Sequence, residues 1–482
     1  MRPDLIRVVT VLSILSAFLV SSPSASATLE PCGDEQLGPD AKCGSFTVFE
    51  DRAAGTGRTI DLRIVVLPAQ GAAEVKEPLF FLAGGPGQGG VDLAELALGP
   101  FAPVREHRDI VLVDQRGTGS SGPIDCPIDA DESPQAAFGN LFDPEHTREC
   151  LREIKGHANP TLYTTDLVVD DLDDVREALG YEKVLLWGGS GGTRTALVWM
   201  RRHPSRVVGA LLDGVAPTDF RAPSTMASGC QNTLDAVFAE CKQQRDCAKA
   251  FPNLEADFQR LLALFDDGPV ETHIVDREGS KIPVEMHRGD FTYAVRGYLY
   301  RARTLVKLPA TIRQAAETGD LHPFAQAYWQ RQVGIRTAIA MGVHFGIYCS
   351  EDLPFIGEGE VANFTKDTFV GRYLYDQYGG VCKVWESTPV DRSFLEPVES
   401  MIPVLIISGY YDPSTPISMG EQVAAHLPNS RHVMVRNESH GAEFGCARPA
   451  VIQFLKTGSL EGLGEICEDV GPIQYEVGRG GL

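Results

Sequence analysis

The segment 183–202 constrains the fold of this chain more than any other feature of its sequence. A short apolar run at 183–187 is followed by Gly-Gly-Ser-Gly-Gly at 188–192 and then by a helical pattern at 193–202. A catalytic serine between a strand and a helix sits on a strained turn that presents its hydroxyl above the sheet, and flanking glycines let neighbouring backbone approach. This order predicts that Ser190 is a nucleophile. The alternative is a glycine-rich turn that only packs.

Further apolar runs indicate the sheet that would carry this turn. Near-continuous hydrophobicity suits parallel strands covered on both faces, and it marks six runs, 78–83, 109–113, 183–187, 207–212, 402–408 and 432–436. A helix is predicted at 166–179, where apolar residues recur at helical spacing and Gly180 follows. These patterns predict an α/β fold, with a mostly parallel sheet and helices on both faces.

The pattern of apolar strands stops after the run at 207–212 and resumes at 402–408. Helical patterns dominate between them, with one hairpin expected around Gly279. We therefore predict one sheet domain built from 28–215 and 396–482. The segment 216–395 would be an inserted, mainly helical cap.

The N-terminal 27 residues predict export. Arg2 and Arg7 make a basic start, 8–20 is apolar, and Ala-Ser-Ala at 25–27 is the small-x-small pattern that signal peptidase cleaves. The apolar run is shorter than the about 20 residues that cross a bilayer. We expect a cleavable signal peptide at 1–27 and a secreted or periplasmic protein with no stable membrane anchor. An uncleaved N-terminal anchor is the alternative.

Export changes the interpretation of the 11 cysteines. Disulfides are the default in an oxidising compartment, and no cysteines here form the paired CxxC pattern of a zinc site. Proximity along the chain suggests five pairs, Cys32–Cys43, Cys126–Cys150, Cys241–Cys247, Cys349–Cys382 and Cys446–Cys467. Cys230 is left over, either as a buried thiol or as a reactive one. No metal site is predicted.

A serine nucleophile needs a histidine base. In a fold of this kind the histidine follows the serine and the acid in the chain, on a loop after a late strand. His440 is the histidine in such a loop, within Glu-Ser-His-Gly at 438–441. His432 should start the last strand, and His426 falls on the helix before it. We therefore predict His440 as the base.

The base in turn needs an acid that orients it. Two aspartates follow predicted strands, Asp412 after 402–408 and Asp213 after 207–212. Asp412 is preferred, because the chain between it and His440 can hold one helix and one strand. Asp213 remains the alternative, although an aspartate ahead of a glycine is more often a turn former.

An oxyanion needs two backbone N–H donors near the serine. We expect one from Gly191, directly after the nucleophile, and one from Gly85 in the turn Ala-Gly-Gly-Pro-Gly at 83–87. That turn could instead be only a tight turn. A phosphate-binding loop is disfavoured, because the segment 84–90 lacks the Walker lysine and does not match GxGxxG.

The chain resembles the α/β-hydrolase serine peptidases of the proline iminopeptidase family, and most of all their secreted, tripeptidyl-aminopeptidase-like branch. The resemblance rests on Gly-Gly-Pro-Gly at 84–87, Asp-Gln-Arg-Gly-Thr-Gly-Ser at 114–120, the glycine-flanked serine at 188–192 and the stretch 409–416. It implies an α/β-hydrolase fold with Ser190, Asp412 and His440 as the triad and no metal or organic cofactor. The implied activity is removal of residues or short peptides from a free N-terminus.

Binding of a free N-terminus requires a carboxylate in the pocket. In the family that the chain resembles, such acids come from the cap. Glu351 and Asp352, next to Cys349, are the best placed here, although most acidic residues are merely solvated. In the motif at 114–120, Arg116 is expected to tie loops together through hydrogen bonds to backbone carbonyls.

The charge of the chain excludes some partners. With 43 Lys and Arg against 65 Asp and Glu, the net charge is −22, which argues against binding nucleic acid or anionic lipid. An acidic surface would favour the approach of peptides by their ammonium ends. The leading hypothesis is a secreted serine aminopeptidase. The alternatives are a carboxylesterase or lipase-like hydrolase with the same triad, and a catalytically silent binding protein.

Overall fold

The computed structural model of this protein describes residues 26–71, 75–126 and 133–478. The predicted signal peptide therefore lies outside the described residues except for its last two positions. Nine strands form the main sheet, namely β1 (Leu29–Pro31), β2 (Lys42–Phe49), β3 (Thr59–Leu67), β4 (Leu79–Leu82), β5 (Ile110–Val113), β6 (Val184–Gly189), β7 (Val207–Asp213), β10 (Val404–Gly409) and β11 (Ser430–Val435).

The sheet is mostly parallel, as the sequence predicts. Its strand order is β1-β2-β3-β5-β4-β6-β7-β10-β11. The pairs from β5 through β11 are all parallel, and the six predicted apolar runs coincide with these six strands. The antiparallel strands β1, β2 and β3 at the other edge were not predicted. On β2 only Val48 is buried, so it lacks the apolar run that marks a parallel strand.

Helices cover both faces of the sheet. Phe80 and Leu82 of β4 pack in one hydrophobic cluster with α3 (Thr165–Ala178) and α4 (Gly191–Arg202). The alternate residues of β4 pack on the opposite face with α1 (Ala94–Leu98) and α16 (Arg448–Thr457). Two remaining helices of this region are α2 (Pro144–Ile154) and α15 (Ile417–Ala424). Because successive side chains of a strand point to opposite faces, a strand buried on both sides must be apolar throughout.

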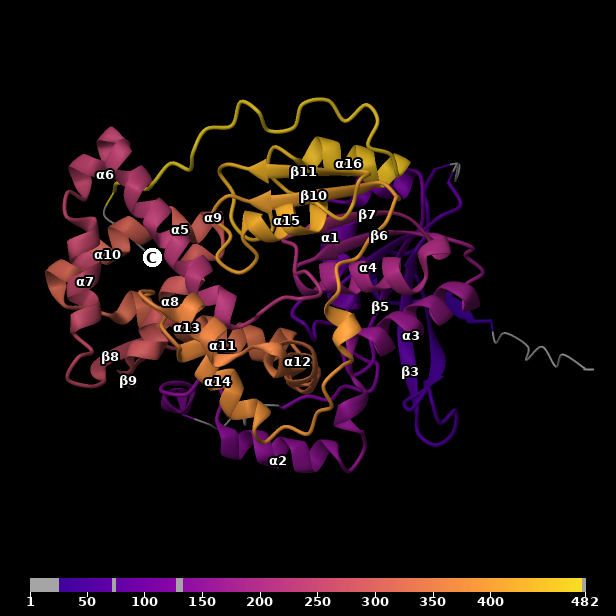
Figure 1. Cartoon of the computed structure of the whole chain (residues 1–482), viewed down its shortest axis with the longest axis horizontal. Coiled ribbons are helices and arrows are strands. Elements are labelled where there is room, and N and C mark those ends of the chain that lie inside the picture. Colours follow the sequence, from indigo (N-terminus) through magenta and orange to yellow (C-terminus); the bar gives the residue numbers. More distant parts are fainter. Residues whose placement is uncertain (1–25, 72–74, 127–132, 479–482) are drawn as a thin grey trace, which may run out of the picture.

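The segment between β7 and β10 is mainly helical and lies to one side of the sheet (Figure 1). The hairpin expected around Gly279 is present. The elements of this segment are α5 (Ser224–Gln243), α6 (Arg245–Ala250), α7 (Leu254–Ala263), β8 (Val270–Val275), β9 (Lys281–Met286), α8 (Arg288–Leu299), α9 (Ala302–Leu305), α10 (Leu308–Thr318), α11 (His322–Ala338), α12 (Met341–Ile347), α13 (Glu358–Thr365) and α14 (Tyr373–Cys382).

The two regions share their hydrophobic clusters. Met341 and Phe345 of α12 pack with the sheet, whereas Phe138 and Tyr475, from outside 216–395, pack with the cap helices. The limits 28–215, 216–395 and 396–482 therefore describe the order of the chain, and as domain boundaries they stay predictions. In the described part of the chain, no helix combines the length and the apolar character needed to cross a membrane.

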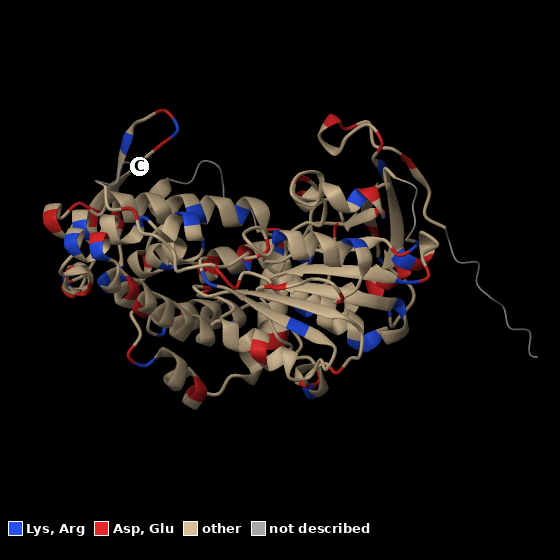
Figure 2. Cartoon of the chain, turned by 90° about the horizontal axis from the view of Figure 1, so that it is seen from above, with Lys and Arg blue, Asp and Glu red and all other residues tan. Residues whose placement is uncertain are grey.

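Charged residues are found in both regions. Figure 2 shows Asp and Glu as well as Lys and Arg on the cap helices and on the elements around the sheet. Charges of both signs are therefore present in both regions.

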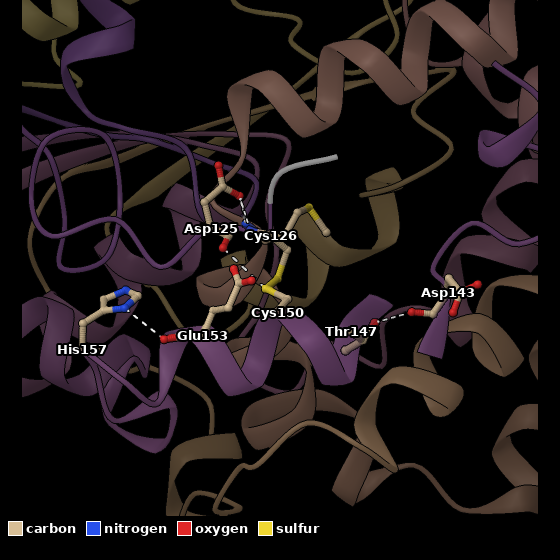
Figure 3. The surroundings of a disulfide bond; sticks show 8 residues. Asp125, Cys126, Asp143, Thr147, Cys150, Glu153 and His157 are labelled. Atoms are coloured by element: carbon tan, nitrogen blue, oxygen red, sulfur yellow. Dashed lines mark hydrogen bonds between the residues drawn. A yellow bond between two sulfur atoms is a disulfide. The ribbon is translucent and has the colours of Figure 1, made fainter. Parts of the chain in front are cut away.

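All five predicted disulfides are formed. Cys126–Cys150 joins the segment after β5 to α2, whose first turn holds the hydrogen bond from the Thr147 hydroxyl to the Asp143 carbonyl, 2.7 Å long (Figure 3). Cys230 is free and buried on α5, which agrees with the first alternative for this cysteine, a buried thiol. Burial raises the pKa of Cys230 to about 11, which keeps it protonated at neutral pH.

Arg116 ties loops together as predicted. Its side chain is fully buried, and Nη1 donates to the carbonyl oxygens of Glu50 and Leu162, both at 2.9 Å. Nε and Nη2 also donate to the two carboxylate oxygens of Asp171 on α3, at 2.7 and 2.8 Å. Burying a guanidinium is costly without a partner for its charge, and the sequence did not identify Asp171 as this partner.

Candidate active site

Ser190 lies on the turn between β6 and α4, where the sequence places it. Its backbone has φ 54° and ψ −123°, a left-handed conformation that is uncommon for a residue other than glycine. Its N–H donates to the carbonyl oxygen of Asp213 at the end of β7, at 2.8 Å. Constrained backbone of this kind is found at functional sites, where the surrounding structure holds it in place.

The two predicted oxyanion donors lie side by side next to this turn. A Cβ added at Gly191 would lie 3.4 Å from the Gly85 nitrogen, and one added at Gly84 would lie 3.3 Å from the Ser190 Cβ. Gly85 has φ 110°, which L side chains rarely adopt. The loop after β4 therefore contacts the serine turn through backbone alone, and its glycines are needed for this approach.

Asp412 and His440 form a buried pair. The Asp412 Oδ2 lies 2.7 Å from the His440 Nδ1, and the two residues are 2% and 5% exposed. Asp412 also accepts hydrogen bonds from the N–H groups of Ser414 and Thr415, at 2.8 and 2.9 Å, and from the Thr415 hydroxyl at 2.7 Å. Burial raises the pKa of Asp412, but the His440 ring and Thr415 lower it more, so the carboxylate stays ionised.

Asp213, the alternative acid, has a different environment. Its Oδ1 accepts from the Ala442 N–H at 3.0 Å. Burial, and after it the neighbouring Glu443, raise the pKa of Asp213 well above its usual range. A carboxyl group whose pKa is raised is a poorer partner for a histidine that must become cationic. The hydrogen bond at Nδ1 and the lowered pKa of Asp412 both pair His440 with Asp412.

His440 lies close to the serine turn. The Asp213 carbonyl oxygen accepts a hydrogen bond from the Ser190 N–H. The next residue is Gly214, and a Cβ added there would lie 3.1 Å from the His440 Cε1. The Tyr300 ring covers the imidazole, with the ring centroids 4.5 Å apart. The rival His432 lies on the edge strand β11, where its Nε2 bonds the Ser408 hydroxyl at 2.9 Å.

A pocket of about 490 Å³ opens at Ser190, within the range of roughly 300–1,000 Å³ that is usual for ligand sites. Gly85 and Gly191 line its floor, and the cap supplies other walls from α8 and α11. The polar and aromatic lining residues from the cap include Tyr293, Arg296, Tyr300, Arg331, Tyr348, Asp352 and Tyr378.

Both acids that the sequence selects for amine binding contact Arg194, but they differ in whether they line the pocket. Glu351 is fully buried and accepts from the N–H and the hydroxyl of Thr165, at 2.6 and 2.8 Å, at the start of α3. Burial raises the pKa of Glu351 to about 7. Asp352 lines the pocket and pairs with Arg194 of α4, with Oδ1 to Nη2 at 2.7 Å. Only Asp352 therefore reaches the pocket lining.

The arginines of the pocket were not predicted from the sequence. Arg194 lies four residues after Ser190, on a helix whose other central residues are buried, and Arg296 lies among the apolar and aromatic residues of α8. A cation within an otherwise buried pattern signals a buried charge that needs a partner. This signal was present in the sequence, but it does not show that α8 and α11 converge on one pocket.

The sheet, the serine turn and the Asp412–His440 pair together define an α/β hydrolase. The sequence family described as alpha/beta hydrolase fold matches residues 77–444. The chain belongs to this family.

Several curated relatives are named as peptidases. The chain is 25% identical to serine protease Hip1 of Mycobacterium tuberculosis over 427 residues, which cover 81% of this chain and 80% of the relative. It is 30% identical to a tripeptidyl aminopeptidase of Streptomyces lividans over 202 residues, covering 39% and 37%. It is 33% identical to a proline iminopeptidase of Neisseria gonorrhoeae over 138 residues, covering 29% and 32%. The chain is thus a hydrolase that resembles serine peptidases.

Proposed function

We propose that this protein is a serine aminopeptidase that cleaves peptides near their free N-terminus through an acyl-enzyme. The observation that carries the proposal is the arrangement of Ser190 on its strained turn beside the Asp412–His440 pair, in a pocket partly walled by the cap. The relatives named as peptidases support an amide substrate over the ester substrate of the alternative hypothesis.

Each residue has a defined role in the proposed reaction. With Nδ1 bonded to Asp412, His440 uses Nε2 to take the proton of the Ser190 hydroxyl as the serine oxygen attacks the scissile carbonyl. The N–H groups of Gly85 and Gly191 stabilise the oxyanion. His440 then gives the proton to the leaving amine as the C–N bond breaks. Water, activated by the same imidazole, hydrolyses the ester on Ser190 and restores the enzyme.

Access to the pocket favours chain ends as substrates. Residues of α8 and α11 and the segment that contains Tyr348 and Asp352 line the pocket together with the serine turn. A peptide end fits such a pocket more readily than the middle of a folded chain. We propose that Asp352 binds the substrate ammonium while it stays paired with Arg194, and that Glu351 supports it by fixing the start of α3.

Acetylation of the substrate tests the aminopeptidase assignment. We expect kcat/KM for a peptide amide to fall roughly 10- to 100-fold when its N-terminus is acetylated, because a charge-assisted hydrogen bond is lost. Asp352→Asn should narrow the difference in kcat/KM between the free and the acetylated peptide. Asp376→Asn, on the exposed side of α14, should leave this difference unchanged. Equal rates on both peptides would contradict the assignment. Hydrolysis of esters but of no peptide would favour the esterase alternative.

We also propose that the protein is exported. The signal-peptide pattern at 1–27 supports this localisation. The five disulfides support it too, because disulfides persist in oxidising compartments.

A further inference from the structure

Arg296 is a buried cation without an acidic partner. It lies on α8, is 5% exposed and lines the pocket. Its Nη2 donates to the Ser414 hydroxyl at 2.8 Å and lies 3.8 Å from the Met226 sulfur, but Nε and Nη1 have no hydrogen-bond partner. Within the described part of the chain, no ion pair compensates this guanidinium. The buried Arg116 and Arg194 have acidic partners, Asp171 and Asp352. The buried Arg108 has two carbonyl oxygens instead, those of Glu77 and Lys456.

A second guanidinium lies beside it. Arg331 of α11, the helix next to α8 in the cap (Figure 1), also lines the pocket and has an unpartnered Nε. Both guanidiniums lie over the same two rings. Arg296 is 5.5 Å from the centroid of Tyr293 and 5.3 Å from that of Tyr300, and Arg331 is 5.4 and 4.7 Å from them. The rings hold the two cations together in the pocket lining.

The described lining of the pocket contains few acidic groups. Cys230 is neutral, because burial raises its pKa. Burial also raises the pKa of Tyr293, but Arg331 and Arg296 lower it more, so the net direction is downward. Asp352, the carboxylate in the described lining, is already paired with Arg194. Keeping cations buried without a counter-charge is costly, and a guanidinium with free N–H groups is suited to binding a carboxylate.

Arg296 is close to the reacting groups. Ser414, the hydrogen-bond partner of Arg296, donates its own N–H to Asp412. Tyr300, which lies against Arg296, also covers the His440 ring. An anion held by Arg296 would therefore lie near the bond that is cleaved.

We propose that Arg296, with Arg331 beside it, binds a carboxylate of the substrate, so that short anionic peptides are the preferred substrate class. The inference rests on the proposed peptidase function. The carboxylate has two possible sources, an acidic side chain near the scissile bond or the C-terminus of a short peptide. In both cases the ammonium end would be bound near Asp352 and the carboxylate at the two arginines.

Two matched peptide series separate these sources. The first compares short alanine peptides with a free C-terminal carboxylate against their C-terminal amides, and the second compares amidated peptides that carry Glu or Gln at one position. We expect the wild-type protein to prefer the anionic member of at least one series by roughly 10- to 100-fold in kcat/KM. Arg296→Gln should remove that preference while leaving the rate on the neutral member much less affected.

Three further variants complete the comparison. Arg296→Lys should restore part of the preference, because it keeps the charge but not the bidentate geometry. Arg331→Gln should also reduce the preference. This variant tests the proposal if Arg296→Gln does not fold. Arg372→Gln removes an exposed cap cation and should leave the preference unchanged. No preference in the wild type, or an unchanged preference in Arg296→Gln and Arg331→Gln, would overturn the proposal.

A binding assay distinguishes failure of this inference from failure of the proposed function. A small phosphonate reagent labels an active serine without any peptide cleavage, and propionate supplies a carboxylate alone. Propionate should slow labelling of Ser190 in the wild type but not in Arg296→Gln. If Ser190 is labelled and no peptide is cleaved, the aminopeptidase proposal is wrong, while protection by propionate still supports the anion site. Labelling without protection, alongside normal peptide cleavage, overturns the anion site alone.

Discussion

Replacing Ser190 with alanine should lower kcat for peptide hydrolysis by about 10⁶-fold, as expected when the nucleophile of a triad is removed. The pocket walls do not depend on the hydroxyl, so KM should change far less. The measurement is steady-state hydrolysis of a peptide amide with a free N-terminus. Binding of the uncleaved peptide to the variant would confirm that the pocket is intact.

Ser205→Ala is the matched control, because this serine is exposed just after α4 and outside the pocket. It should retain wild-type activity. A Ser190→Ala variant that kept more than a small fraction of the wild-type kcat would mean that another group attacks the substrate. The positive φ at Ser190 would then need a different explanation.

Asp412→Asn should lower kcat by about 10⁴-fold, the size of effect seen when the acid of a triad becomes an amide. The Asp412 carboxylate accepts from the His440 Nδ1 and so leaves Nε2 free to take the serine proton. An asparagine can donate to Nδ1 instead, which would stabilise the wrong tautomer of the ring. The packing around it should survive, because the two side chains have nearly the same shape.

Asp213→Asn is the informative comparison, because it changes the other buried aspartate near the site. Its carboxyl already favours the neutral form, which an amide imitates. We expect a far smaller loss of kcat than for Asp412→Asn, measured on the same substrate. The reverse order of effects would assign the catalytic acid to Asp213.

Much of the fold follows from local patterns in the sequence. A strand buried on both faces must be apolar throughout, so the parallel strands are visible as short continuous runs. The positions of Asp412 and His440 could be predicted because loops that follow parallel strands meet at one edge of the sheet. The disulfides join cysteines that are near each other in the chain, with separations of 6 to 33 residues, so proximity was a sufficient guide.

The chemistry of the pocket could not be predicted in the same way, because it depends on contacts between distant segments. Arg296 and Arg331 contact the same two rings, those of Tyr293 and Tyr300. This contact requires two helices to lie against each other. Glu351 accepts a hydrogen bond from Thr165, which is far away in the sequence.

The overall charge is also a poor guide to the charge at the site. The chain has a net charge of −22, yet Arg296 and Arg331 of its pocket have no acidic partner among the described residues. A total charge averages over the whole chain, and substrate binding depends on the few groups that face the pocket.

The proposed mechanism requires Ser190 to become acylated by a substrate with a free N-terminus. Labelling with a peptidyl phosphonate that carries a free amine, followed by proteolysis and mass spectrometry, tests this requirement. We expect one covalent adduct per chain, located on Ser190, and much slower labelling by the N-acetylated reagent. An adduct on another residue, or no adduct from a protein that still hydrolyses peptides, would contradict the proposed mechanism.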